Sequence, residues 1–294
     1  MAGGDDNSER PANDPGDERQ AWDSVAGAWR KHWRFVEAAT RELNARLIEQ
    51  AAIVEGNSVL DVACGQGEPA LTAARLVGPC GRVTATDFSK GMLDEARDRA
   101  TAAGLTNLEF LERDAQALGF EPRTFDAATC RWGLMLIPDP RAALRGIFES
   151  LKPGGRLAAA IWGPPDRVPF ITLPRDVAVR ELGLPAPPEP GLDAPPNPLR
   201  LAHPGMLEEL FREAGFEDVW SESVAVTFRF ASPEEYVTMI RDMSSTMRGT
   251  LDEHPEEVRE RVWSGIAAKA GQYRDDEGRV ALPNAAPCVW GRRK

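Results

Sequence analysis

Two aspartates and two glycines lie at a spacing that suits nucleotide binding. Asp61 lies inside a short apolar run, residues 59–63, which is typical of a buried parallel strand. Gly65 and Gly67 follow, and glycine lets the chain turn sharply while bare backbone approaches a ligand. Asp87 comes twenty residues after Gly67, at the end of the next predicted strand. A carboxylate there can accept hydrogen bonds from both hydroxyls of a ribose.

The elements that position these residues are a strand, a glycine turn and a helix. Pro69 fits the first turn of that helix, where its missing N–H costs nothing. Free amides and the positive end of the helix dipole then face a ligand. Many nucleotide folds share a G-x-G turn after a strand, and Ala70 at the third position is also allowed in dinucleotide-binding proteins. The turn alone therefore leaves a nicotinamide-dependent dehydrogenase open.

The wider pattern resembles the class I S-adenosylmethionine (SAM)-dependent methyltransferases. Their first motif reads D-x-G-x-G-x-G, with Ala63 here in place of the first glycine, and their second strand ends in an acid, here Asp87. Residues 87–93 and the turn at 151–157 match the same family. That turn, the site at Asp114 and the pattern of strand seven argue against a dehydrogenase. Within the class, the pattern is most similar to the ubiquinone/menaquinone-type C-methyltransferases and to natural-product small-molecule methyltransferases.

This resemblance implies SAM as cofactor, S-adenosylhomocysteine as product and a set of residues around the cofactor. Phe88 and Met92 would lie against the adenine, and Asp114 would meet its amino group. Arg131 could hold the cofactor's carboxylate or an anionic acceptor. Simpler roles are core packing for Met92, a turn or helix cap for Asp114 and a surface salt bridge for Arg131. The expected cofactor-binding residues are Asp61, Ala63, Gly65, Gln66, Gly67, Asp87, Phe88, Met92, Asp114, Ala115 and Arg131.

Four tryptophans are expected to line an acceptor pocket. Trp29 and Trp33 share one face of a predicted N-terminal helix, and the resemblance implies that this helix closes over the cofactor. Trp132 and Trp162 follow predicted strands four and five, at the edge where ligands bind in open α/β sheets. The alternative for the helical tryptophans is core packing.

His32 is the best candidate for a catalytic base, because it lies beside the Trp29 face of the helix. His203 and His254 each precede a proline and suit structural or exposed positions better. A methyl group on a sulfonium can be transferred mainly by aligning the acceptor and excluding water. The lack of a recognisable catalytic triad is therefore compatible with an enzyme.

Composition restricts the partners. The chain has 294 residues, and its net charge of −11 argues against nucleic acid or an anionic membrane. The four scattered cysteines favour a reduced, cytoplasmic protein, and they offer no metal-ligand spacing with the three histidines. No apolar run approaches the ~20 residues of a membrane span, and the N-terminus lacks the parts of a signal peptide. We expect a small-molecule acceptor; the pattern does not address the oligomeric state.

The expected fold is α/β, a doubly wound seven-stranded sheet of order 3-2-1-4-5-7-6 whose strand seven is an antiparallel edge strand. Residues 164–204 hold 12 of the 24 prolines, too many for a continuous helix or central strand. Two helices are expected before strand one, and later helices are expected to start after a cap at Ser89 and at Asp139-Pro140. The predicted parts are a disordered tail (1–19), an N-terminal helical lid (20–56), a SAM-binding Rossmann-like core (57–163), a proline-rich acceptor cap (164–204) and the C-terminal part of the sheet (205–294) with a helical insertion (233–272).

The sequence therefore predicts a SAM-dependent methyltransferase that acts on a small molecule by direct in-line displacement. The expected reaction is O- or C-methylation of a natural-product or quinone-like acceptor. The alternative is a SAM-binding protein of the same fold that is regulatory or catalyses another reaction, since only binding residues are visible in the motifs.

Overall fold

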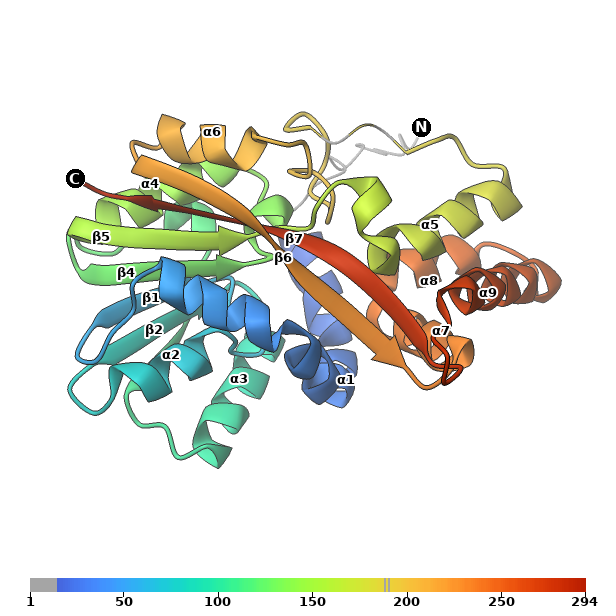
Figure 1. Cartoon of the computed structure of the whole chain (residues 1–294), viewed down its shortest axis with the longest axis horizontal. Helices are drawn as coiled ribbons and strands as arrows, with labels where there is room; N and C mark the ends of the chain where they lie inside the picture. The colour runs from blue at the N-terminus through green and yellow to red at the C-terminus, as the bar shows by residue number, and fades with distance from the viewer. Residues whose placement is uncertain (1–14, 188, 190) are drawn as a thin grey trace, which may run out of the picture.

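The computed structural model describes residues 15–187, 189 and 191–294, and one seven-stranded sheet organises them (Figure 1). The strand order is β3-β2-β1-β4-β5-β7-β6, which confirms the predicted order. Strands β1 to β5 pair in parallel, and β7 is antiparallel to both of its neighbours. The strands are β1 Ser58–Val62, β2 Arg82–Asp87, β3 Leu108–Glu112, β4 Phe125–Arg131, β5 Leu151–Ala160, β6 Glu217–Phe230 and β7 Val280–Arg292.

Helices cover both faces of this sheet and form a second group beyond it. Figure 1 shows β6 and β7 running past the carboxyl ends of the other strands to a cluster of α5, α7, α8 and α9. The α-helices are α1 Pro15–Gln50, α2 Ala70–Val77, α3 Lys90–Ala102, α4 Pro140–Ser150, α5 Pro169–Leu182, α6 Met206–Glu213, α7 Pro233–Met243, α8 Ser245–Asp252 and α9 Glu256–Ala270. Short 3₁₀ turns are η1 Ala115–Ala117, η2 Leu134–Leu136, η3 Pro165–Arg167 and η4 Gly271–Tyr273.

Local sequence signals fix several helix starts. The Ser89 side chain accepts a hydrogen bond from the Met92 amide at the start of α3. Asp139 accepts from the Ala142 amide, and Pro140 occupies the first turn of α4. Each cap satisfies an amide that the helix itself leaves unpaired. The two helices therefore begin where the sequence predicts.

The register of the parallel strands brings the candidate residues to one edge. Asp61 of β1 pairs with Ala85 of β2 on one side and with Thr129 of β4 on the other. Two residues further along, Asp87 ends β2 and Arg131 ends β4. The glycine turn after β1 thus lies between them at the carboxyl edge, where open α/β sheets bind ligands.

The prediction that strand seven is an edge strand is wrong, because β7 lies between β5 and β6. Its two prolines, Pro283 and Pro287, are tolerated inside the sheet because of the direction in which they face. The Pro287 carbonyl accepts from the Ile161 amide, so the side of Pro287 without an N–H faces away from β6. Pro283, four residues earlier, has the same orientation in the strand. The ladder between β6 and β7 therefore loses no donor at either proline.

Two helices were expected before strand one, but α1 is a single helix of 36 residues. The helix interior contains no proline, and Gly27 costs about 1 kcal/mol, which is too little to divide a packed helix. The helix starts at Pro15, so residues 15–19 are helical and the predicted tail boundary at residue 19 is wrong for them. The rest of that tail, residues 1–14, lies outside the described residues.

The proline-rich segment contains one regular helix, and the predicted insertion is helical as expected. α5 lies within residues 164–204 and has Pro174 inside it. From residue 183 to 205 the described residues have turns and bends but no regular element. The predicted insertion at 233–272 consists of α7, α8 and α9.

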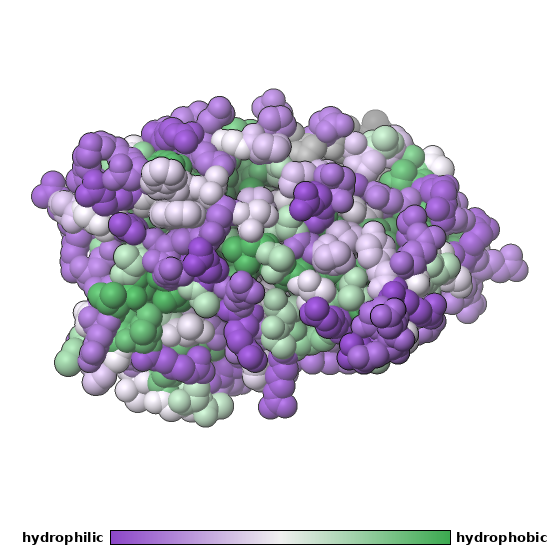
Figure 2. Space-filling view, viewed as in Figure 1, coloured by the Kyte–Doolittle hydropathy of each residue, from purple (hydrophilic) through white to green (hydrophobic). Residues whose placement is uncertain are grey.

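The surface seen in Figure 2 is mixed. Hydrophilic residues dominate its rim, and hydrophobic ones form separate patches among them. Within residues 15–187, 189 and 191–294, no helix combines the length and the apolar character that crossing a bilayer requires.

Candidate active site

The glycine turn after β1 has the backbone conformation that its residues predict. Gly65 and Gly67 have φ values of 51° and 102°, the left-handed region that glycine adopts without strain. Ala63, which replaces the family's first glycine, also has a positive φ of 54°. The Cys64 amide donates to the Thr86 carbonyl at 2.9 Å, which anchors the turn to β2. The turn keeps its shape despite the alanine, at the cost of local strain.

Asp61 supports this turn from below. Its carboxylate is fully buried and accepts hydrogen bonds from the Ala70 amide at 3.1 Å and from the Thr129 hydroxyl at 2.7 Å. Burial raises the pKa of Asp61 to about 7, and the bond from Thr129 opposes that shift. Both oxygens are used inside the protein, so the geometry gives Asp61 a positioning role: it joins β1, the start of α2 and β4.

Asp87 bridges the two turns that face the carboxyl edge. One oxygen accepts from the Gly65 amide and the other from the Ser89 amide, both at 2.9 Å. Burial raises its pKa to about 6, and these amide bonds oppose the rise. Each carboxylate oxygen has a second lone pair, so the group can still accept from ribose hydroxyls. Beside it, Phe88 is half-buried and Met92 is buried.

The turn after β3 is held to the start of α4. Asp114 is exposed, and its Oδ1 accepts from the Gln116 amide at 2.8 Å, which makes it the cap of η1. The Gln116 side chain in turn accepts from the Asp139 amide at 3.0 Å. Asp114 therefore has the capping role that its position allowed, with Ala115 half-buried beside it. A contact with adenine remains a prediction.

Arg131 points to α1. Its Nη1 donates to the Thr40 hydroxyl at 2.9 Å and to the Asn44 side-chain oxygen at 2.8 Å. Burial lowers the pKa of its guanidinium. Within the part of the chain that the structure describes, no carboxylate forms a salt bridge with Arg131. The surface salt bridge suggested as its simpler role is therefore absent from those residues, and Arg131 ties the end of β4 to the lid helix.

Further polar contacts fasten α1 to the cofactor-binding elements, and the sequence analysis missed them. Asp23 accepts from the Ser89 hydroxyl at 2.5 Å and from the Gly91 amide at 3.0 Å. The Gln66 side chain, with its amide oriented to satisfy both groups, bonds the Trp29 carbonyl at 3.1 Å and the Arg30 amide at 2.8 Å. The lid thus rests directly on the glycine turn and on the start of α3.

Two ion pairs extend the same contact along α3. Arg30 pairs with Glu95, and Glu37 pairs with Arg99 at 2.5 Å. Arg99 also donates to the Gln66 carbonyl at 2.7 Å, which connects the second pair to the glycine turn.

The four predicted acceptor-pocket tryptophans fall into separate groups. Trp29 packs with Val25, Ala26 and Met92 in a small cluster and also against the main core. Trp33 lies under the Arg99 guanidinium, 4.3 Å from ring centroid to Cζ. Trp132 and Trp162 stack on each other with centroids 4.0 Å apart and planes at 15°.

The aromatic contacts continue from Trp162 into the cap. Phe170 of α5 stacks on Trp162 at 6.2 Å and on Phe228 of β6 at 4.2 Å. An aromatic wall, defined here as Trp132, Trp162, Phe170 and Phe228, therefore runs from the end of β4 to β6.

His32 lies where α1 meets α7. Its Nε2 is 2.7 Å from Asp242 Oδ2, and the Lys31 ammonium donates to the same oxygen at 2.6 Å. A carboxylate on one ring nitrogen fixes the tautomer, so that the other nitrogen is the proton acceptor. His203 is exposed and its Nδ1 lies 3.0 Å from the neighbouring Pro204 carbonyl.

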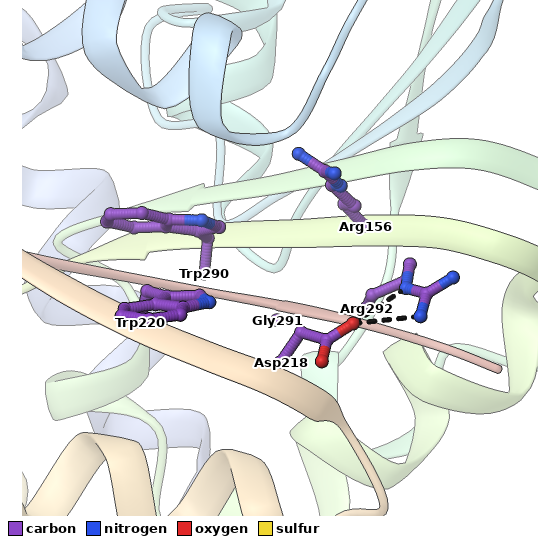
Figure 3. A pocket seen from close by; sticks show the side chains of 6 residues that line it. All are labelled: Arg156, Asp218, Trp220, Trp290, Gly291 and Arg292. Carbon is purple, nitrogen blue, oxygen red and sulfur yellow. Dashed lines mark hydrogen bonds and ion pairs between the residues drawn. The ribbon is translucent and has the colours of Figure 1, made fainter.

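A separate hollow lies near the amino ends of the parallel strands. Figure 3 shows Trp290 and Trp220 side by side on the sheet, Arg156 next to them, and Arg292 paired with Asp218. Arg156 is level with Ala127, near the start of β4. This hollow is therefore distinct from the carboxyl edge. Among the described residues, no group of His, Cys, Asp and Glu side chains is arranged to hold a metal ion.

The sequence around the glycine turn is similar to known methyltransferases. Residues 37–163 match the ubiE/COQ5 methyltransferase family. A demethylmenaquinone methyltransferase from Lactococcus lactis is 34% identical over 140 residues, which are 47% of this chain and 56% of that protein. The chain spans about half the length of the curated relatives it matches. The resemblance to SAM-dependent methyltransferases is thus confirmed for the half of the chain that carries the glycine turn and Asp87.

Solved structures extend the similarity of fold over more of the chain. The YcgJ protein from Bacillus subtilis has a TM-score of 0.57 at 16% identity and covers 86% of this chain and 99% of its own. The [4+2]-cyclase SpnF has a TM-score of 0.52 at 20% identity and covers 92% of this chain and 97% of its own. At these identities the likeness concerns the fold alone.

Asp61→Asn tests the buried carboxyl. Because the folded-state pKa of about 7 lies above the ordinary value of 3.8, the folded protein holds this proton more tightly than the unfolded chain. Its contribution to stability is therefore fully present below pH ~4, falls as the pH rises and levels off above pH ~7. Asn can still accept from the Ala70 amide and can donate its Nδ2–H to the Thr129 hydroxyl oxygen, but it does not titrate. We expect the stability of Asp61→Asn relative to wild type to rise between pH 4 and 7.5 by on the order of 3 kcal/mol, measured by urea unfolding. A pH-independent difference would contradict the assignment.

Gly133→Ala tests the contact between the two turns. A Cβ on Gly133 would lie 2.6 Å from the Ala63 Cβ and 2.8 Å from the Cys130 sulfur. We expect a loss of about 1–3 kcal/mol in the free energy of unfolding. The matched control is Gly249→Ala in α8, where a Cβ meets nothing within 4 Å, and alanine should there be neutral or favourable by up to ~1 kcal/mol. Equal stability of the two variants would show that the turns do not approach each other in this way.

Proposed function

We propose that the carboxyl edge of the sheet binds SAM and that the protein transfers its methyl group to a small-molecule acceptor. The observation that carries this proposal is the Asp87 carboxylate, which is bonded to Gly65 of the glycine turn within the stretch that matches the ubiE/COQ5 family. The likeness to demethylmenaquinone methyltransferase supports C-methylation of a quinone-like acceptor as the preferred reaction. O-methylation of a natural product is the nearest variant of the same reaction.

The residues at the edge fit SAM by the kinds of groups they offer. Asp87 supplies acceptors for the ribose hydroxyls, and Gly65 and Gly67 keep the turn free of side chains, so that a ligand can approach its backbone closely. Phe88 and Met92 supply an apolar surface for adenine, with Asp114 and Ala115 at its rim. Arg131 supplies a positive charge near the cofactor's carboxylate, although its Nη1 is already used by α1. Asp61 and Ala63 shape the turn.

When bound, SAM supplies a methyl group on a positively charged sulfur, open to in-line attack. The protein's part is to align the acceptor, keep water out and accept a proton where the acceptor loses one. α1 covers the turn through Asp23, Gln66 and Arg131. We assign proton acceptance to His32, oriented by Asp242. We place the acceptor between the lid face of Trp29 and Trp33 and the pair Trp132 and Trp162.

A second candidate function is a different reaction on the same fold. The likeness to the [4+2]-cyclase SpnF over 92% of this chain favours keeping it, because that protein has the same fold and is a cyclase. Methyl transfer from isotopically labelled SAM to a panel of quinols and phenols separates the two. The net charge of −11 supports a non-nucleic-acid acceptor, and four free cysteines support a cytoplasmic location.

The cofactor assignment predicts selective binding. S-adenosylhomocysteine and SAM should each raise the melting temperature, because a ligand that binds only the folded state stabilises it, and NAD at the same concentration should not. Asp87→Asn should weaken S-adenosylhomocysteine binding by at least ~1.5 kcal/mol, about tenfold, in calorimetric titration. Asp218→Asn, at the other end of the sheet, is the matched control and should bind as wild type does. A shift with NAD alone would support a dehydrogenase instead.

The pH dependence of the same titration provides an independent check. The ionised Asp87 is the better acceptor for ribose hydroxyls, and its pKa is raised to about 6 by burial. Affinity for S-adenosylhomocysteine should therefore increase between pH 5 and 7 in the wild type and stay level in Asp87→Asn. Parallel curves for the two proteins would exclude Asp87 as the titrating group.

A further inference from the structure

The indole N–H of Trp132 is a buried donor without an acceptor. Its Nε1 has almost no exposed surface and forms no hydrogen bond with any described residue. A buried indole N–H normally finds a partner, and leaving one unpaired costs about 1–3 kcal/mol. An unpaired donor at a ligand-binding edge is therefore expected to meet an acceptor that arrives with a ligand.

The backbone holds this indole in place. Trp132 directly follows β4 and has a φ of 59°, which is unusual for a bulky residue. Its amide donates to the Ala160 carbonyl at 2.8 Å, which fixes it to the end of β5. Gly133 then passes so close to Ala63 that no side chain fits between them. Strain of this kind persists where the surroundings over-determine it, as at ligand-binding sites.

The aromatic wall orients the ring itself. One face of Trp132 is covered by Trp162 at 4.0 Å, and Trp162 is only 5% exposed. The indole therefore has little freedom to turn its N–H towards another partner. Offset stacking in this range adds about 0.5–1.5 kcal/mol to the burial of the rings.

The neighbouring polar side chains have partners of their own. Arg131, whose Cζ lies 5.5 Å from the Trp132 ring centroid, donates to Thr40 and Asn44. Both of these are on α1, so the polar contacts of Arg131 point to the lid. The other unpaired indole N–H, that of Trp29, belongs to the cluster with Met92, on the α3 side of the glycine turn. Trp132 is thus the unpaired donor on the β4–β5 side, where the aromatic wall begins.

We propose that the Trp132 Nε1–H donates a hydrogen bond to an oxygen atom of a flat-ring acceptor and sets the position of that ring at the methyl group. This inference rests on the proposed function. During transfer, the acceptor's nucleophilic atom forms a bond to the methyl carbon while the carbon–sulfur bond breaks and its electron pair goes to sulfur. The acceptor loses one proton to a base. The N–H stabilises the charge that develops on the ring oxygen as that proton leaves.

The test compares two ligands and two side chains. 1-Naphthol and 1-methylnaphthalene have the same ring and nearly the same shape, but only the first carries an oxygen. Trp132→Phe keeps an aromatic ring on Trp162 and removes the N–H together with part of the indole ring. The loss that 1-naphthol shows beyond 1-methylnaphthalene then reports the N–H. In calorimetric titrations of the protein saturated with S-adenosylhomocysteine, Trp132→Phe should raise the Kd of 1-naphthol about fivefold, as expected for one neutral hydrogen bond. The Kd of 1-methylnaphthalene should rise less, because this ligand loses only contact with the ring and no hydrogen bond.

Controls separate this proposal from the proposed function. Trp220→Phe removes an exposed indole at the other end of the sheet and should leave both Kd values unchanged. The Kd of S-adenosylhomocysteine, measured first, should be the same in wild type and Trp132→Phe. Failure of the wild type to bind S-adenosylhomocysteine would contradict the proposed function. Normal S-adenosylhomocysteine binding with equal loss, or no loss, for the two naphthalenes would overturn the role of Trp132, as would a selective loss of S-adenosylhomocysteine affinity.

Melting curves exclude a simple folding defect. Trp132→Phe should unfold within a few degrees of wild type, because the stack on Trp162 remains. If the variant does not fold, the Kd values of 1-naphthol and 1-methylnaphthalene for the wild type still test the proposed hydrogen bond to the ligand oxygen. An oxygen-dependent advantage of the same size supports the proposal, and equal affinities contradict it.

Discussion

The buried carboxyl group of Asp61 is the interaction on which the rest of the site depends. It joins three elements that are far apart in sequence: its own strand, the Ala70 amide at the start of α2 and the Thr129 hydroxyl of β4. Because the carboxyl is fully buried, it can be accommodated only with both of these partners in place. Asp61 therefore holds both ends of the glycine turn that leads from β1 to α2. Asp87 then fixes the same turn from the side of β2.

The lid helix links the two halves of the proposed reaction. Near its start, Asp23 of α1 bonds to Ser89 at the beginning of α3. The backbone at Trp29 and Arg30 bonds to the glycine turn, and Thr40, further along, accepts a hydrogen bond from Arg131. His32, on the same helix, meets Asp242 of α7 among the helices beyond the sheet. The helix therefore touches both the proposed cofactor side and the proposed acceptor side. A movement of α1 would change both sides together, which is the arrangement expected of a lid that excludes water.

The sequence predicted the sheet order, the helix starts at Ser89 and Pro140, and the cluster of candidate residues at the carboxyl edge. These follow from local signals: apolar runs, caps and glycine turns. The contacts that were missed join residues far apart in the chain. Asp23 and Ser89 are 66 positions apart, and His32 and Asp242 are 210 apart. Local patterns carry no information on such pairings. The contacts that hold α1 against the glycine turn and α3, and the orientation of His32, are therefore visible only in the three-dimensional structure. The position of β7 inside the sheet was misjudged because its two prolines suggested an edge, whereas their orientation leaves the ladder to β6 intact.

A crystal structure of the protein with S-adenosylhomocysteine tests the central claim most directly. The account predicts the ribose hydroxyls within hydrogen-bond distance of Asp87, the adenine beside Phe88 and Met92, and the thioether sulfur on the side of the glycine turn that faces Trp132. The contradictory result is a ligand that lies away from the carboxyl edge, for example in the hollow between Trp220 and Arg156, with Asp87 still bonded only to Gly65 and Ser89.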